Sequence, residues 1–258
     1  MLRTIENTFC LLMIYSFGGW VWESVFCSLW DHHKLINRGF LNGPYCPIYG
    51  WGALLDLFVL GKIENPVLLF FASGVLCCAL EYVTSYVLEK WFHARWWDYS
   101  DMKFQFQGRI CLLGFLAFGG FSVAVIDGIN PLLQAGLDRL PDPAMHWISG
   151  TVFAGFAADN VITFIGISGF NRRLKEFAQL LETVPARLGT ATDTVKEKIR
   201  LEQRLDTAKQ AYESFLQKVT RQQKRILHAF PKLRSLPYEN ALNELRRRLT
   251  RRKDGTDE

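Results

Sequence analysis

Long parts of this 258-residue sequence lack positive charge. Five apolar stretches contain no Lys or Arg away from their ends: 8–30, 45–61, 66–92, 110–137 and 145–170. A helix that crosses the hydrocarbon core of a bilayer needs about 20 mostly apolar residues, and four of the stretches reach that length. The stretch 45–61 is shorter and Gly-rich, so we expect it to be tilted, broken or shielded by its neighbours. The pattern excludes an ordinary water-soluble domain and predicts an all-α membrane helical bundle with five spans.

Several sequence motifs are also missing. No G-x-x-x-x-G-K-[ST] occurs, so any ATPase that works with this chain must be a separate subunit. The six Cys include no C-x-x-C, and the adjacent His32 and His33 do not have metal-ligand spacing. We therefore expect no metal, no cofactor and no disulfide framework. The first stretch holds Glu23 and lacks a small-residue cleavage site, so it does not match a cleavable signal peptide.

The tail lacks Trp and Cys entirely, and this divides the chain into two unlike parts. Residues 1–170 carry nine Lys and Arg against thirteen Asp and Glu, whereas residues 171–258 carry twenty-one against twelve. We predict a transmembrane bundle over 1–170 and a basic cytosolic helical tail over 171–258. Basic residues collect on the cytoplasmic side of membrane proteins. The tail and the six basic residues of the predicted inner loops, against three in the outer segments, place the N-terminus outside and the C-terminus in the cytoplasm.

Each predicted span carries a carboxylate, and an acid in hydrocarbon costs about 2.5–3.5 kcal/mol, so such residues are functional candidates. The five are Glu23, Asp56, Glu81, Asp127 and Asp159. Helical spacing places Glu23, Glu81 and Asp159 on stripes of small and polar residues that face the bundle interior, so we expect these three to converge. The alternative is that each acid is protonated and only links helices by hydrogen bonds. Asp56 and Asp127 lie toward span ends, where that structural role is favoured.

Two predicted cytoplasmic loops have unusual compositions. Gly and Pro at residues 43–47 exclude a regular helix there, and the second loop, 93–110, is rich in aromatic and charged residues. Three arginines of these loops, Arg38, Arg95 and Arg109, are the cations that we expect to reach Glu23 or Glu81. In particular, we predict that Arg95 or Arg109 pairs with one of these two acids.

The two loops also carry a family resemblance. The runs RGFLNGPYCPIYGWG (38–52) and LEYVTSYVLEKWFHARWWDYSDMKFQFQGRICLLG (80–114) resemble the hallmark blocks of a bacterial family of ABC-transporter permeases, the putative ABC-transporter type IV family. The resemblance covers roughly residues 10–170 and excludes the tail. It implies a multi-span protein of the bacterial inner membrane, and it brings no established substrate or catalytic residues.

The tail has an apolar pattern of its own. Leu201, Leu205, Ala208, Tyr212, Phe215, Val219, Gln222 and Ile226 follow heptad spacing, which predicts a coiled-coil dimer or an intramolecular hairpin. A stripe of Gly150, Ala154 and Ala158 offers a second contact for a homodimer. The basic clusters are expected to bind anionic membrane lipids. No fold motif supports nucleic-acid binding.

Three functions remain open from these residues. The first is a transport permease or accessory membrane subunit whose substrate or coupling cation meets Glu23, Glu81 and Asp159. The second is a membrane-embedded enzyme on a lipid-linked substrate, with Glu81 and His93 as acid and base groups beside Arg95 and Arg109. The third is a non-catalytic scaffold. Because no nucleophile or metal spacing is present, catalysis is the less favoured reading, and we name no catalytic residue.

Overall fold

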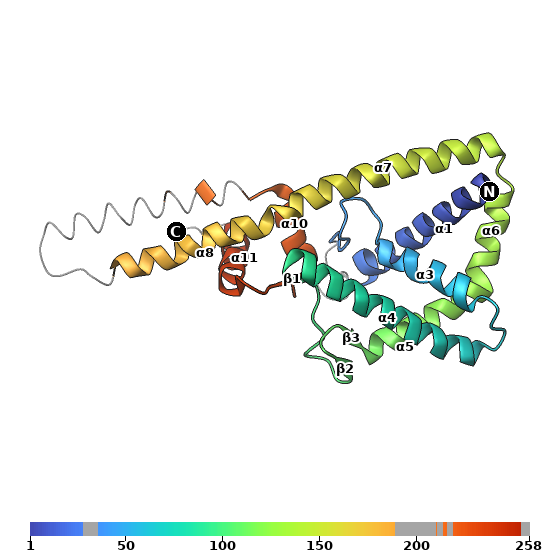
Figure 1. Ribbon diagram of the computed structural model, residues 1–258, viewed down its shortest axis with the longest axis horizontal. Coiled ribbons are helices and arrows are strands. Elements are labelled where there is room, and N and C mark those ends of the chain that lie inside the picture. Colours follow the sequence, from blue (N-terminus) through green and yellow to red (C-terminus); the bar gives the residue numbers. More distant parts are fainter. Residues whose placement is uncertain (28–35, 189–209, 211–213, 216–218, 254–258) are drawn as a thin grey trace, which may run out of the picture.

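The computed structural model describes residues 1–27, 36–188, 210, 214–215 and 219–253 (Figure 1). Most of this part of the chain is helical, as the composition predicts. The helices of the N-terminal part are α1 (Leu2–Val21) with its π-helical continuation η1 (Trp22–Cys27), α3 (Pro47–Leu60), α4 (Pro66–Phe92), α5 (Leu112–Ala124), η2 (Val125–Ile129), α6 (Asn130–Asp138) and α7 (Asp142–Ser168). The tail contributes α8 (Phe170–Leu188), α10 (Arg221–Ala229) and α11 (Glu239–Lys253).

Three helical segments are long and apolar enough to cross a membrane: Pro66–Phe92, Leu112–Asp138 and Asp142–Gln179. They correspond to the third, fourth and fifth predicted spans. The second predicted span is the short apolar helix α3, and the first is the helix α1 followed by η1. The structure thus supports three of the five spans by length and composition. Many large apolar side chains on these helices are exposed, as expected of surfaces that face lipid.

Local sequence explains where the helices begin and bend. The Asn65 side chain accepts hydrogen bonds from the Val67 and Leu68 backbone N–H groups, both at 3.0 Å, and caps α4 directly before Pro66. α4 ends at His93, which has a left-handed φ of 47°. Between α5 and α6 the chain changes direction (Figure 1) through the π-helical turn η2 and Pro131, both common causes of a helix kink.

The short helix α3 packs closely against α1. A Cβ atom on Gly50 would collide with the Leu12 carbonyl oxygen and the Ser16 hydroxyl, and one on Gly19 would collide with the Tyr49 ring. These two glycines therefore permit the close approach of the two backbones, as small residues do between membrane helices. Residues 43–46 have no regular structure, which confirms the prediction for all of the segment 43–47 except its last residue, Pro47, where α3 begins.

Two short antiparallel ladders, which the sequence did not predict, follow α4. β1 (Ala94–Arg95) pairs with β4 (Arg234–Ser235), so that Ala94 lies opposite Ser235. β2 (Gln105–Phe106) pairs with β3 (Ile110–Cys111) within the second loop. The first ladder joins the end of a membrane helix to the tail.

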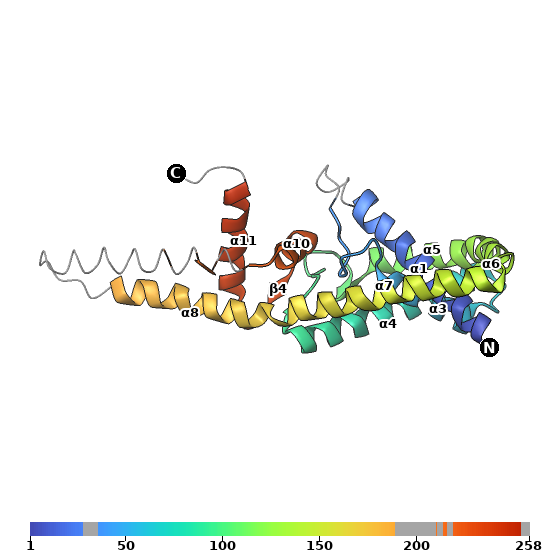
Figure 2. The ribbon, with the colours of Figure 1, turned by 90° about the horizontal axis from the view of Figure 1, so that it is seen from above.

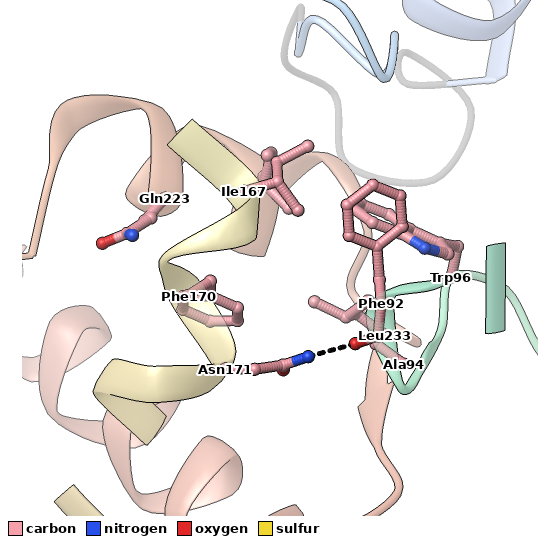
Figure 3. Close-up of a pocket in the computed structure, with 9 residues that line it drawn as sticks. Phe92, Ala94, Trp96, Ile167, Phe170, Asn171, Gln223 and Leu233 are labelled. Atoms are coloured by element: carbon pink, nitrogen blue, oxygen red, sulfur yellow. Dashed lines mark hydrogen bonds between the residues drawn. The ribbon is translucent and has the colours of Figure 1, made fainter. Parts of the chain in front are cut away.

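The largest hydrophobic core lies where the tail meets the ends of α4 and α7 (Figures 1 and 2). Trp96 contacts Phe40 and Phe230 edge to face, with ring centroids 4.8 and 5.2 Å apart, and Phe177 of α8 stacks on Phe215 at 4.7 Å. Figure 3 shows a cavity of about 20 Å³ in this core, where the Asn171 side chain donates a hydrogen bond to the Phe92 carbonyl oxygen. Residues on both sides of the predicted boundary at 170 therefore share one core.

The structure describes only part of the predicted coiled coil. Leu201, Leu205, Ala208 and Tyr212 lie outside the described residues. Of the later heptad positions, Phe215, Val219 and Ile226 are buried in the core just described. At these positions the heptad pattern serves contacts within one chain, which agrees with the hairpin alternative. A coiled coil is not confirmed.

We predict that this core stabilises the tail. Leu242 of α11 is 0% exposed, whereas Leu236 is 57% exposed. Truncating a fully buried Leu to Ala typically costs about 2–5 kcal/mol. Leu242→Ala should therefore lower the midpoint of thermal unfolding of the detergent-purified chain, and expose the tail to limited proteolysis. Leu236→Ala is the matched control and should leave both unchanged. Equal behaviour of the two variants would contradict the core assignment.

Candidate functional site

The most isolated carboxylate of the bundle is Glu81, in the middle of α4. Its Oε1 atom accepts a hydrogen bond from the Tyr99 hydroxyl at 3.0 Å, and its Oε2 atom is buried with no hydrogen-bond partner among the described residues. The whole residue is 7% exposed. An acid with one unsatisfied buried oxygen is unusual enough in a native structure to require an explanation.

Glu23 of η1 is the acid close enough to Glu81 to act on it electrostatically. Its Oε1 atom accepts a hydrogen bond from the Tyr49 hydroxyl at 2.6 Å, and the Arg38 Nε atom lies 3.8 Å from its Oε2 atom. The sequence predicts that Arg38 reaches Glu23 or Glu81, and the structure places it beside Glu23. At 3.8 Å and partial exposure this ion pair is a weak one.

Tyr99 connects the two acids electrostatically. Burial is the largest cause that raises the pKa of Tyr99 far above its ordinary value, and the charge of Glu81, its hydrogen bond and the charge of Glu23 add to it. Tyr99 therefore stays a neutral hydrogen-bond donor. Two carboxylates and two tyrosine hydroxyls form one polar cluster where η1, α3, α4 and the second loop meet. We call Glu23, Tyr49, Glu81 and Tyr99 the carboxylate–tyrosine cluster.

The predicted pairing of Arg95 or Arg109 with Glu81 or Glu23 is wrong. Both arginines bind Glu89, two turns farther along α4: Arg109 Nη2 lies 2.9 Å and Arg95 Nε 3.2 Å from its Oε2 atom. Arg109 also donates to the Ser85 hydroxyl at 3.0 Å. Glu89 lies near the end of α4, next to the loop that carries both arginines. Glu81 lies two turns farther from that loop, so the arginines pair with Glu89.

His93 does not join the carboxylate–tyrosine cluster either. It is exposed, ends α4, and accepts a hydrogen bond from the Leu236 N–H at its carbonyl oxygen at 3.1 Å. Twelve residues separate it from Glu81 on one helix, which corresponds to about 18 Å at a rise of 1.5 Å per residue. The structure therefore does not assemble the proposed acid and base pair.

Asp159 of α7 belongs to a different contact. Its carboxylate accepts hydrogen bonds from the Gly43 N–H at 2.8 Å, the Tyr45 hydroxyl at 2.6 Å and the Asn42 side chain at 2.8 Å. Thr163, one turn along α7, donates at 3.1 Å. These bonds hold the first loop against α7. Asp159 thus anchors a loop. Of the three acids that were expected to converge, only Glu23 and Glu81 lie in one cluster.

Arg225, from the tail, binds the same loop from the other side. Its guanidinium donates two hydrogen bonds of 2.8 Å, to the carbonyl oxygens of Gly39 and Phe40. Burial lowers the pKa of Arg225, and the negative charge of Asp159 opposes this shift. The sequence did not single out Arg225, because nothing in a basic tail distinguishes an arginine that contacts a distant loop from its neighbours.

A second tail arginine binds the second loop. Arg234 Nη1 lies 3.2 Å from the Asp98 carboxylate, and Arg95 Nη1 lies 3.9 Å from it. Burial raises the pKa of Asp98, but hydrogen bonds from Ser100 and Arg234 and the charge of Arg95 outweigh it and leave the pKa below its ordinary value. The tail therefore contacts both predicted cytoplasmic loops.

Two further acids are buried at helix contacts. Asp56 is 1% exposed and receives hydrogen bonds from the Ser122 hydroxyl and, at 3.4 Å, from the Cys77 thiol. It links α3, α4 and α5 in the interior, although its position in the sequence suggested a span end. Glu6 binds His146 Nδ1 at 2.6 Å and joins α1 to α7; it precedes the predicted first span and was not considered. Asp127 is exposed.

The described residues contain no group of three or more His, Cys, Asp and Glu that could hold a metal ion. The carboxylate–tyrosine cluster can bind a positively charged species or a proton. It has no nucleophile activated by a base in the contacts described above.

The Glu89 contacts generate a prediction. Arg109 has a side chain only 7% exposed, and Glu89→Gln would leave it buried without its charged partner. Breaking a buried pair typically costs about 3–5 kcal/mol, so the variant should unfold at a clearly lower temperature in detergent. Glu176→Gln removes the exposed pair with Arg172 on α8 and should cost less than about 1 kcal/mol. Similar losses in the two variants would contradict a special role of Glu89.

Comparisons with known proteins agree with the membrane architecture. No curated protein and no solved structure matches the chain. A family model described as putative ABC-transporter type IV matches residues 10–164, which is more than half of the chain and includes both sequence blocks noted above. The match ends before the tail, so Arg225 and Arg234 lie outside it. The chain belongs to the putative ABC-transporter type IV family.

Proposed function

We propose that this chain is a membrane permease or accessory subunit of an ABC-type transporter, with a substrate that the residues do not name. The family and the apolar helices fit a membrane protein related to transport. The single observation that carries the proposal further is the carboxylate–tyrosine cluster. Glu81 of this cluster is a buried acid that belongs to no ion pair among the described residues, and ionisable residues inside membrane proteins typically mark substrate and ion pathways. Glu23 and Glu81 are the residues proposed to line such a pathway, and Asp159 holds the loop beside it.

The remaining site candidates take supporting roles in this proposal. Arg38 offsets part of the charge of Glu23, while Arg95 and Arg109 fasten the second loop to Glu89. His93 ends α4, and its carbonyl oxygen accepts a hydrogen bond from the Leu236 N–H of the tail. None of them needs to contact the transported species. The proposal involves no catalytic residue and no bound cofactor.

The proposed topology has five membrane helices in the bacterial inner membrane. α1 with η1 and the short α3 would cross as a packed pair, held together at Gly19 and Gly50 and covered by longer neighbours. The start of α1 and α6 lie at one end of the molecule, while α10 and α11 lie toward the other (Figure 1), which supports termini on opposite sides. We place the N-terminus outside and the tail in the cytoplasm, where its basic residues can meet anionic lipid headgroups. A homodimer is compatible with this arrangement.

A separate ATPase is the proposed partner, because the chain carries no nucleotide-binding motif of its own. The second loop offers a contact surface: Phe104 is 79% and Phe106 57% exposed, on a loop otherwise held by Glu89 and Asp98. Exposed aromatic side chains on a rigid loop are typical anchors of protein interfaces. The tail lies against the same loop through Lys232, which is 3.1 Å from Asp101.

The topology predicts a labelling pattern. In a chain whose native cysteines are replaced, Lys62→Cys and Arg139→Cys should react with a membrane-impermeant maleimide added to intact cells. Lys103→Cys, in the second loop, should react only after the membrane is opened. All three positions are exposed, so burial does not explain a failure to react. Labelling of position 62 or 139 from the cytoplasmic side alone would overturn the topology.

The partner predicts a purification result. A tagged chain isolated from gently solubilised native membranes should carry a nucleotide-binding subunit and hydrolyse ATP. Phe104→Ser combined with Phe106→Ser should remove that subunit and most of the activity. Phe58→Ser, at a residue 73% exposed on the membrane helix α3, is the control and should retain both. A purified chain without ATP hydrolysis, or loss of the subunit in the control alone, would speak against the proposal.

A further inference from the structure

Glu81 differs from the other buried acids in what satisfies its charge. Asp159 receives several hydrogen bonds, Glu23 has Arg38 beside it, and Glu89 has two arginines. Glu81 receives one hydrogen bond, from Tyr99, and its Oε2 atom is buried without a partner among the described residues. Asp56 and Glu6 also each have one buried carboxylate oxygen without a partner among the described residues, but the other oxygen of Asp56 receives Ser122 and Cys77, and that of Glu6 contacts His146 and Ser149. Glu81 combines such an oxygen with a single donor and a second acid, Glu23, nearby.

The groups that face Glu81 from each neighbouring element are neutral or negative. Cys78 lies on its own helix, Cys111 precedes α5, Tyr99 comes from the second loop and Glu23 from η1. On α5, a Cβ atom added to Gly114 would lie 3.8 Å from the Oε2 atom, so the α5 backbone lies close to that oxygen. None of the ion pairs among the described residues includes Glu81, and the two arginines of the second loop bind Glu89 instead.

An isolated carboxylate in such surroundings is costly, because a buried charge without a partner loses its hydration and gains nothing in return. The acid usually takes up a proton instead. A second negative charge nearby, here Glu23, works in the same direction, since two interacting carboxylates do not both ionise easily. A proton also fits the space, because it needs no cavity and no further ligands.

We propose that Glu81 binds an exchangeable proton, and that Tyr99 and Glu23 connect this proton site to the side of the bundle that carries the second loop. On release, the O–H bond of the Glu81 carboxyl breaks and a new O–H bond forms on a water molecule or on the Glu23 carboxylate. The Tyr99 hydroxyl remains hydrogen-bonded to Glu81 in both states, as acceptor from the acid and as donor to the carboxylate. Glu23, whose side chain is 31% exposed, is the more exposed acid of the two.

This proton site goes beyond the proposed transport function and does not rest on it. If transport holds, a cation that arrives at Glu23 reduces the repulsion between the two acids and lets Glu81 release its proton. If transport fails, the proton on Glu81 is still there to be measured.

Infrared spectroscopy of the full chain in lipid nanodiscs tests the proposal directly. A protonated carboxyl has a carbonyl stretching band that is separate from the bands of a carboxylate and shifts in D₂O. At neutral pH, Glu81→Gln should remove one such band. Glu64→Gln is the control: Glu64 is exposed, so its substitution should remove only carboxylate signal. Retention of every protonated-carboxyl band in Glu81→Gln would overturn the proposal.

Two further variants keep the test decisive if Glu81→Gln does not fold. Tyr99→Phe retains the acid but removes its hydrogen-bond partner, so the same band should remain and change frequency. Glu23→Gln removes the neighbouring negative charge, so the band should disappear at a lower pH than in the unmodified chain. An unchanged band in both variants would show that the protonated acid is not Glu81.

Discussion

The cost of a charge in a medium with few mobile dipoles organises this protein. Glu89 lies near the end of α4 and binds both Arg95 and Arg109, so three charges satisfy one another there. This contact fastens the second loop across α4 and brings Tyr99 over Glu81. It also removes the two cations that could have reached the interior. The same interaction that stabilises the loop therefore leaves Glu81 without a counter-ion.

Charged and backbone contacts from the tail also hold the two loops. Arg225 binds the backbone of the first loop, Arg234 binds Asp98 of the second, and β4 pairs with β1. Both tail segments, α10 with Arg225 and β4 with Arg234, lie outside the region that the family model matches, residues 10–164. The two sequence blocks that identify the family are thus held in place by residues that the family model does not cover. Changes in the tail can reach both loops without altering the membrane helices.

The Asp and Glu side chains of the bundle have several different structural roles. Asp159 accepts hydrogen bonds from five donor groups of four residues and anchors a loop, Asp56 links three helices through Ser122 and Cys77, and Glu6 joins α1 to α7 through His146. Both oxygens of Asp159 accept hydrogen bonds. Asp56 and Glu6 each keep one buried oxygen without a partner among the described residues, but their other oxygen has two polar contacts to neighbouring helices, which fits a structural role. Glu81 has a single donor and lies near a second acid, and it is at that pair that we place a proton or a cation.

Apolar length and the placement of basic residues determine much of this protein without any structure. They predict the helical membrane class, the three long spans, the loop before α3 and the family, because hydropathy and helix period are local properties of the chain. Partner choice is not local. Which acid an arginine meets depends on which helix end lies beneath its loop, and for Arg95 and Arg109 that was Glu89. Likewise, only the folding back of the tail decided that the apolar positions Phe215 and Ile226 pack within one chain, and only the packing of α3 between α1 and α4 buried Asp56.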